Sequence, residues 1–350
     1  MTNSFGRKAS RPSLIGLILA TSFSLLVATT STSQAASAAA AKPYVAMAKA
    51  PCDVSQKNIY WLSVLKGHPT LRLWQQGFLD EAKRLGYKSA TIAAPDDADW
   101  TKSVALGEGI LAAKPDGLVL GFIDPAEKDL IAKFAAAGVP VTMGHVVVKP
   151  NQYPGLVAFA AFDAPAWGKS AADVIGAKIK GKGTVAVSEG SFNAEEDLVA
   201  AAFKKEMNHK YPKVKVLKPI VEGFDPPKAI SIASSLLLAH PDVVGALSTT
   251  GAGPVTWAGA ADQTSRTVYA IGPDATRPNM DAVKAGKILG IAAQPGYEEH
   301  EMAVDLLTQA ICSQKPKFAN LLPAPIVTAR GLAPYYKVAD EVDARVASQK

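Results

Sequence analysis

Cysteine and histidine are scarce in this sequence, whose 350 residues include two cysteines and five histidines. The histidines lack the close spacing of zinc ligands, and two cysteines alone do not make a metal site. We therefore expect no metal and no cofactor. In an exported protein, an even number of cysteines favours a disulfide between Cys52 and Cys312, with two buried free thiols as the alternative.

A strong charge of one sign is also missing. The chain has 37 Lys and Arg against 31 Asp and Glu, which gives a net charge of +6. Three of the positive charges, Arg7, Lys8 and Arg11, precede an apolar stretch near the N-terminus, and without them the net charge is about +3. This bias is too small to indicate a nucleic-acid partner.

Long uninterrupted hydrophobic runs are missing too. The apolar stretch 14–28 contains three hydroxyl side chains, which argues against a permanent transmembrane helix. Basic residues before this stretch and the small residues at 36–38 after it are typical of a secretory signal peptide. We predict a cleaved signal peptide at 1–38, an alanine-rich linker at 39–56 and a periplasmic location. A lipoprotein anchor is not expected, because Cys52 lies well beyond the apolar stretch.

Enzyme motifs are absent or incomplete. Gly168-Lys169-Ser170 resembles the end of a phosphate-binding loop, but Asp163 stands where the first glycine is required. The sequence has no G-x-S-x-G elbow and no H-E-x-x-H pattern, and its carboxylate pairs lack a spacing typical of glycoside hydrolysis. We therefore predict a binding protein rather than an enzyme. A periplasmic enzyme is the alternative.

Short apolar runs alternate with helical patterns along the rest of the chain. The expected strands are 59–65, 90–93, 117–122, 139–143, 156–161, 184–187, 214–217, 243–247, 268–271 and 288–293. These runs are continuous rather than alternating, which is typical of strands covered on both faces. Repeated strand–helix units predict an α/β fold with parallel sheets, and the length favours two doubly wound lobes over one very large sheet.

Four local patterns resemble one known family. They are AGVPV at 137–141, AHPDV at 239–243, IGPD at 271–274 and AQ at 293–294, and Gly77 stands eight residues after Pro69 as in that family. Their order and spacing resemble the type I periplasmic substrate-binding proteins of ABC transporters, in the ribose- and galactose-binding branch. The likeness covers about 57–330.

The resemblance implies two Rossmann-like lobes joined by a three-segment hinge. One lobe would hold 57–161 and 295–324, and the other 162–293 and 325–340. Both cysteines then fall in the first lobe, which favours the disulfide. The implied function is capture of a sugar-like or polyol-like molecule between the lobes and delivery to a membrane ABC permease, by a monomer. A ligand sensor that docks on a chemoreceptor or sensor kinase is the alternative.

The resemblance also implies ligand contacts at the carboxyl ends of the strands. Asp274 matches a carboxylate that accepts hydroxyl hydrogen bonds, and its alternative role is to cap the following helix. Gln294 matches a hinge amide, with a purely interlobe role as the alternative. Phe224 matches an aromatic ring that packs on a sugar, with core packing as the alternative.

Several positions depart from the family pattern. His68, Thr70 and Leu71 replace an asparagine and two aromatic residues, and His145 and Thr250 stand where an aspartate and an asparagine are usual. A family arginine is replaced by Val199. The site is therefore less suited to a highly hydroxylated pyranose than to a smaller polyol or a modified sugar. The expected ligand contacts are His68, Thr70, Leu71, His145, Phe162, Phe224, Thr250, Asp274 and Gln294, and Trp74, Trp100 and Phe162 are candidates for a stacking wall.

Three consecutive acids, Glu195, Glu196 and Asp197, begin one expected helix. Acids in a first turn complement the helix dipole, and Asn193 with Glu196 fits a capping box. We favour this structural role over a cation-binding role.

Overall fold

The computed structural model describes residues 44–191, 194–223 and 225–348. The predicted signal peptide at 1–38, and residues 39–43 of the predicted linker, lie outside the described residues. Two β-sheets organise the described chain. One is six-stranded, in the order β12-β5-β4-β3-β1-β2, and the other is seven-stranded, in the order β13-β11-β10-β9-β6-β7 with β8 paired to β6. We call the units built on them the N-terminal and C-terminal lobes.

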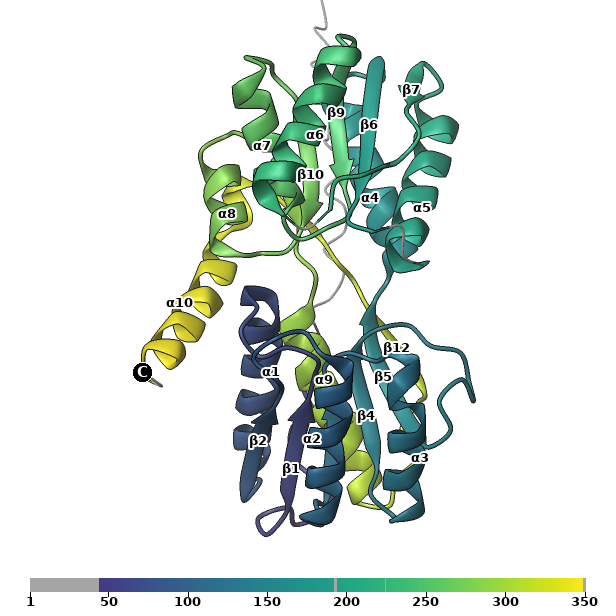
Figure 1. Ribbon diagram of the computed structural model, residues 1–350, viewed down its shortest axis with the longest axis vertical. Helices are drawn as coiled ribbons and strands as arrows, with labels where there is room; N and C mark the ends of the chain where they lie inside the picture. The colour runs from purple at the N-terminus through teal and green to yellow at the C-terminus, as the bar shows by residue number, and fades with distance from the viewer. Residues whose placement is uncertain (1–43, 192–193, 224, 349–350) are drawn as a thin grey trace, which may run out of the picture. The chain divides into compact units, whose positions relative to one another are not determined.

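The N-terminal lobe combines the start of the described chain with two later segments. Its elements are β1 (Asn58–Leu62), α1 (Pro69–Leu85), β2 (Ser89–Ala93), α2 (Trp100–Ala112), β3 (Gly117–Leu120), η1 (Pro125–Glu127), α3 (Lys128–Ala136), β4 (Val141–His145), β5 (Leu156–Phe162), α9 (Gly296–Ile311) and β12 (Ala319–Leu322). Helices lie on both faces of its sheet (Figure 1).

The C-terminal lobe is built mainly from the middle of the chain. Its elements are α4 (Ala164–Lys178), β6 (Gly183–Glu189), α5 (Ala194–Lys210), β7 (Val214–Val216), β8 (Ile220–Val221), α6 (Pro226–Ala239), β9 (Val243–Ser248), α7 (Gly253–Gln263), β10 (Tyr269–Pro273), α8 (Arg277–Lys284), β11 (Gly290–Ala292), β13 (Ile326–Val327), η2 (Ala329–Gly331) and α10 (Ala333–Ser348).

The predicted fold class is confirmed, because each lobe is a parallel sheet between helices. Among the described pairings only β11 with β13 is antiparallel. The chain passes between the sheets three times, from β5 to α4, from β11 to α9 and from β12 to β13. The lobe boundaries inferred from the sequence remain a proposal.

Residues on β1 show why continuous apolar runs form these sheets. Side chains alternate across a strand, and Trp61 packs with α1 and α9 on one face while Leu62 packs with α2 and α3 on the other. Both side chains are fully buried. A strand covered on both faces therefore needs apolar residues at successive positions, not at every second one.

A close helix approach explains the glycine that the family pattern shares. Gly77 on α1 faces the backbone of α9, and a Cβ atom at this position would lie 2.1 Å from the Tyr297 carbonyl oxygen. Only glycine leaves room for this contact without moving one of the helices. Gly77 therefore fixes how α1 packs and, with it, the orientation of the loop that precedes α1.

The described part of the segment predicted as a linker is bound to the N-terminal lobe. Tyr44 and the Met47 amide donate hydrogen bonds to the Asp305 carboxylate on α9, the second over 2.7 Å. Cys52 and Cys312 form a disulfide with Cα atoms 5.5 Å apart. The segment 44–56 is thus attached to the lobe before the first strand begins.

Loss of this disulfide is expected to destabilise the protein. The bridge closes a long loop, with a sequence separation of 260 residues, and removing such a cross-link typically costs about 2–4 kcal/mol. The double variant Cys52→Ser/Cys312→Ser should therefore unfold at lower urea concentration than the wild type. Thiol titration of the denatured wild type before and after reduction is the control. Equal thiol counts in the two samples would rule the bridge out.

No helix within the described ranges is long and apolar enough to cross a lipid bilayer. The described chain likewise holds no group of three or more histidine, cysteine or acidic side chains arranged to bind a metal ion.

Candidate functional site

A cavity of about 620 Å³ lies where the carboxyl ends of strands from both sheets meet. A volume of this size suits a small metabolite. Apolar atoms make up most of its surface, but eleven lining residues carry hydroxyl, amide, imidazole or carboxyl groups. The described residues that line it are Val64, Leu65, His68, Thr70, Leu71, Trp74, Ala98, Trp100, Phe122, His145, Phe162, Trp167, Glu195, Glu196, Val199, Pro226, Thr249, Thr250, Gly251, Ala252, Val255, Pro273, Asp274, Thr276, Pro278, Asn279 and Gln294.

The structure brings eight of the nine expected ligand contacts together around this cavity. They are His68, Thr70, Leu71, His145, Phe162, Thr250, Asp274 and Gln294. The ninth, Phe224, lies outside the described residues. Their role as ligand contacts remains a proposal.

Asp274 supplies the most buried carboxylate of the cavity. It follows β10, has a left-handed backbone with φ of 70°, and is 7% exposed. Its Oδ2 accepts a hydrogen bond of 3.1 Å from the Thr70 hydroxyl, and the Asn279 side-chain amide donates to its backbone carbonyl. Thr276, not Asp274, occupies the N-cap position of α8. The Asp274 carboxylate is therefore not used to cap that helix.

Burial controls the charge of Asp274. It raises the pKa of the carboxyl group, while His145, the Thr70 hydroxyl and His68 oppose that rise. A glycine faces the same carboxylate, since a Cβ atom on Gly251 would lie 2.4 Å from Asp274 Oδ2. Glycine at position 251 therefore leaves room beside Asp274 Oδ2 that any other residue would fill.

His145 forms a buried pair with an acid from another element. Its Nδ1 lies 3.0 Å from Oε2 of Glu299 on α9, and the Glu299 side chain is fully buried. Burial alone would lower the pKa of His145, but the Glu299 and Glu195 carboxylates outweigh it and raise the pKa to about 9. His145 is thus an imidazolium at neutral pH. Its backbone is also left-handed, with φ of 79°.

Left-handed backbone is uncommon for residues other than glycine, although histidine and aspartate tolerate it better than most. In this site it occurs at His145 and Asp274, one in each lobe. Strained backbone tends to gather where a side chain must be aimed at a ligand. This geometry supports a functional role for both residues.

Aromatic rings form one wall of the cavity. Trp74 stacks on Phe122, with ring centroids 5.8 Å apart and planes at 11°, and Trp100 lies 6.4 Å from Phe122. Phe162 lies 5.5 Å from the His145 ring, which is 4.2 Å from Trp74. Trp74 is both buried and cavity-lining, so it contributes to the core of the N-terminal lobe and to the cavity wall at once.

The acids at the start of α5 have two different roles. Oε2 of Glu196 accepts hydrogen bonds from the backbone amides of Gly190 and Ser191, at 2.7 and 3.2 Å, and so stabilises the turn before the helix. Glu195 is half-buried, and burial raises its pKa to about 7, with His145 opposing and Glu299 assisting. Asn193, the expected cap, lies outside the described residues.

His68 also has a structural role. Its Nδ1 accepts a 3.3 Å hydrogen bond from the Thr70 amide, so it caps α1 while lining the cavity. Gln294 lies in the segment that connects β11 to α9, one of the three passages between the sheets. Motion at this segment would therefore move a cavity residue.

Sequence reasoning missed several residues of this site, among them Phe122, Asn279 and Glu299. The sequence pattern marks Phe122 only as the end of an apolar run, although its position two residues after β3 is a usable signal. Asn279 and Glu299 act from inside helices, where no local pattern distinguishes them from surface polar residues.

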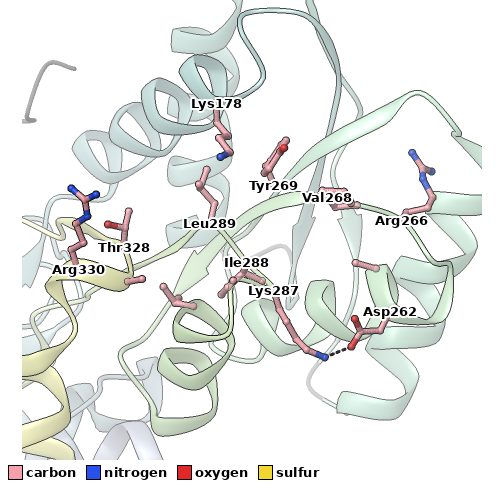
Figure 2. Close-up of a pocket in the computed structure, with 15 residues that line it drawn as sticks. Lys178, Asp262, Arg266, Val268, Tyr269, Lys287, Ile288, Leu289, Thr328 and Arg330 are labelled. Carbon is pink, nitrogen blue, oxygen red and sulfur yellow. Dashed lines mark hydrogen bonds and ion pairs between the residues drawn. The ribbon is translucent and has the colours of Figure 1, made fainter. Parts of the chain in front are cut away.

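A second hollow, of about 670 Å³, lies in the C-terminal lobe, beside the amino ends of strands β10 and β11 (Figure 2). Three of its four basic side chains, those of Lys178, Arg266 and Lys287, are engaged within the lobe. Lys287 pairs with Asp262, and the Lys178 ammonium lies 4.9 Å from the centre of the Tyr269 ring. Arg266 donates to the carbonyl oxygens of Leu237, His240, Pro241 and Val243. We assign no ligand to this hollow.

Solved structures of known proteins share the fold. AraP, an arabinose-binding protein from Geobacillus stearothermophilus, is 21% identical, with 80% of this chain and 99% of AraP covered and a TM-score of 0.74. An ABC transporter periplasmic solute-binding protein from Actinobacillus succinogenes 130z, with bound D-allose, is 19% identical, with 80% and 100% covered and a TM-score of 0.72.

A third structure is an ABC transporter solute-binding protein from Bacillus halodurans C-125 with bound myo-inositol. It is 16% identical, with 82% of this chain and 99% of that chain covered and a TM-score of 0.70. No curated protein matches the sequence. The periplasmic binding protein domain family, in contrast, matches residues 59–315. That match spans most of the chain and confirms the resemblance drawn from the sequence motifs, so this protein belongs to the periplasmic binding protein family.

Proposed function

We propose that this protein is a periplasmic solute-binding protein that captures a sugar-like or polyol-like molecule between its lobes and delivers it to an ABC permease. One observation carries the proposal: a cavity of metabolite size lies at the carboxyl ends of strands from both sheets, with Asp274 and Gln294 on its wall. Ligands of open parallel sheets bind at such strand ends.

The chemistry of the cavity suits hydroxyl groups on a carbon ring or chain. A carboxylate such as Asp274 accepts O–H hydrogen bonds, which are strong because the acceptor is charged. The Gln294 amide both donates and accepts. The half-buried rings of Trp100 and Phe122 offer apolar surface for C–H groups.

The structural relatives support the same class of ligand. Their bound or named ligands are arabinose, D-allose and myo-inositol, two sugars and a cyclic polyol. We extend the class, not the individual molecules, to this chain. The signal peptide inferred at 1–38 and the family's periplasmic character support export to the periplasm.

The output we propose is transport by a monomer that changes shape on binding. Three passages connect the lobes, and closure around a ligand through such hinges would present a different surface to the permease. No catalytic step is proposed, because the cavity chemistry requires only hydrogen bonding and stacking.

Ligand binding should raise the melting temperature of the mature protein. A ligand that binds only the folded state, present at about 100 times its Kd, stabilises by about 2.7 kcal/mol, which corresponds to a shift of several degrees. The measurement is a melting panel of sugars and polyols, with native mass spectrometry for co-purified ligand. The proposal fails if no member of the panel shifts melting and the purified protein instead turns over a substrate.

A further inference from the structure

The charge of the cavity points beyond a neutral sugar. Its described lining contains three carboxylates, Glu195, Glu196 and Asp274, and neither lysine nor arginine. The positive charge of His145 is already opposed by Glu299, 3.0 Å away. These three carboxylates therefore share one charged imidazole, His145, which also opposes the raised pKa of Glu195 and of Asp274, and acidic groups remain in excess on the lining.

Two of these acidic groups are partly buried, which makes their charged forms less stable than they would be in water. Asp274 is 7% exposed and Glu195 is half-buried, so both carboxylates are partly removed from water. Burial is the main cause of the raised pKa values of both groups. A cation bound near them would restore part of the lost stabilisation of their charged forms.

The aromatic wall suits a cation as well as a sugar. Trp74, Trp100, Phe122 and Phe162 all line the cavity, and Trp74 and Phe122 stack nearly parallel. The face of an aromatic ring attracts a positively charged ammonium group, tryptophan most strongly. Aromatic rings combined with carboxylates are a usual arrangement for binding an amine.

We propose that the ligand of this protein carries a protonated amine in addition to its hydroxyl groups, with the amine placed between Glu195, Asp274 and the aromatic wall. The inference rests on the proposed function, since it names the class of molecule that the same cavity binds. Hydroxyl groups would use Gln294 and Thr250, and the amine would use the carboxylates. An amino sugar or an amino-substituted cyclic polyol has this combination of groups.

Matched pairs of compounds test the proposal. The pairs are D-glucosamine with D-glucose, D-galactosamine with D-galactose, and scyllo-inosamine with scyllo-inositol, each measured by titration calorimetry at neutral pH, because a more acidic buffer would protonate Glu195, whose pKa is about 7. In at least one pair the amine should bind about tenfold tighter than its hydroxyl partner. Acetylation of that amine, which removes the charge, should abolish the advantage.

Two variants test whether Glu195 causes the tighter binding of the amine. Glu195→Gln should reduce the affinity for the amine about tenfold more than it changes the affinity for the neutral partner. Glu206→Gln makes the same change on the same helix, α5, outside the cavity, and should have no effect. Melting curves of both variants establish that they are folded.

The outcomes separate this inference from the function on which it rests. If neutral sugars bind and no amine binds more tightly, the inference is overturned and the solute-binding proposal stands. An amine preference that persists unchanged in Glu195→Gln also overturns it. If neither the six compounds nor the wider sugar and polyol panel binds, both proposals fail.

Discussion

Asp274→Asn should weaken binding of the best sugar, polyol or amino sugar about a hundredfold. A hydrogen bond to a charged group contributes about 1.5–3 kcal/mol, and the neutral amide also replaces one acceptor oxygen with a donor. A loss of about 2–3 kcal/mol corresponds to that change in Kd. Asparagine tolerates the left-handed backbone of this position, so the fold should survive. The measurement is titration calorimetry.

A matched control variant distinguishes the loss of a ligand contact from a general effect of the substitution on the C-terminal lobe. Asp262→Asn makes the same substitution in the C-terminal lobe, at the second hollow, where Asp262 pairs with Lys287 at the surface. Its affinity should equal that of the wild type. If the Asp274→Asn protein binds the ligand as tightly as the Asp262→Asn protein does, Asp274 is not a ligand contact.

Glu299→Leu should produce the largest loss of stability. The substitution leaves His145 buried without its carboxylate, and breaking a buried ion pair in this way typically costs about 3–5 kcal/mol. The double variant His145→Leu/Glu299→Leu removes both charges and should be less destabilised than Glu299→Leu alone. Urea denaturation measures the wild type, the two single variants His145→Leu and Glu299→Leu, and the double variant. Additive losses in the double variant would show that the pair is not coupled.

The same pair predicts a pH dependence with a defined sign. The pKa of His145 is about 9 in the folded protein and about 6.5 in an unfolded chain. Its stabilisation is therefore fully present below about pH 6.5 and is lost as the pH rises through about 9, by about 3 kcal/mol at most. Glu299→Leu should lack this loss. Equal pH dependence in wild type and variant between these limits would contradict the assignment.

The sequence was most informative about features that repeat along the chain. Continuous apolar runs such as GLVL at Gly117–Leu120 predict buried parallel strands, because each side chain of β3 contacts a covered face. The strand ends then predict where cavity residues lie, since parallel strands point the same way. This explains why His145 and Asp274 could be selected from positions 129 residues apart.

Other parts of the site depend on tertiary contacts that leave no local pattern. Glu299 acts on His145 across 154 residues of sequence, from the first turn of a helix that holds another acid beside it. Asn279 reaches the Asp274 backbone only because α8 starts beside β10. The short strands β12 and β13 were likewise missed, because two to four residues carry too little periodicity to be recognised.

The acidic start of α5 shows how one motif can serve two roles. Both Glu195 and Glu196 line the cavity. Glu196 has a structural role as well, because its carboxylate accepts hydrogen bonds from the backbone amides of Gly190 and Ser191, while the predicted capping box with Asn193 lies outside the described residues. Sequence alone could not separate the two acids, because neighbouring residues on a helix point about 100° apart and only the packing of α5 decides what each one contacts.

A crystal structure with the ligand identified by native mass spectrometry tests the central claim most directly. The account predicts electron density in the cavity between the lobes, with ligand polar atoms about 3 Å from the Asp274 carboxylate and the Gln294 amide, and with ligand carbon atoms against Trp100 or Phe122. Ligand density in the second hollow beside Tyr269 and Lys287, with the cavity between the lobes containing only water, would contradict it.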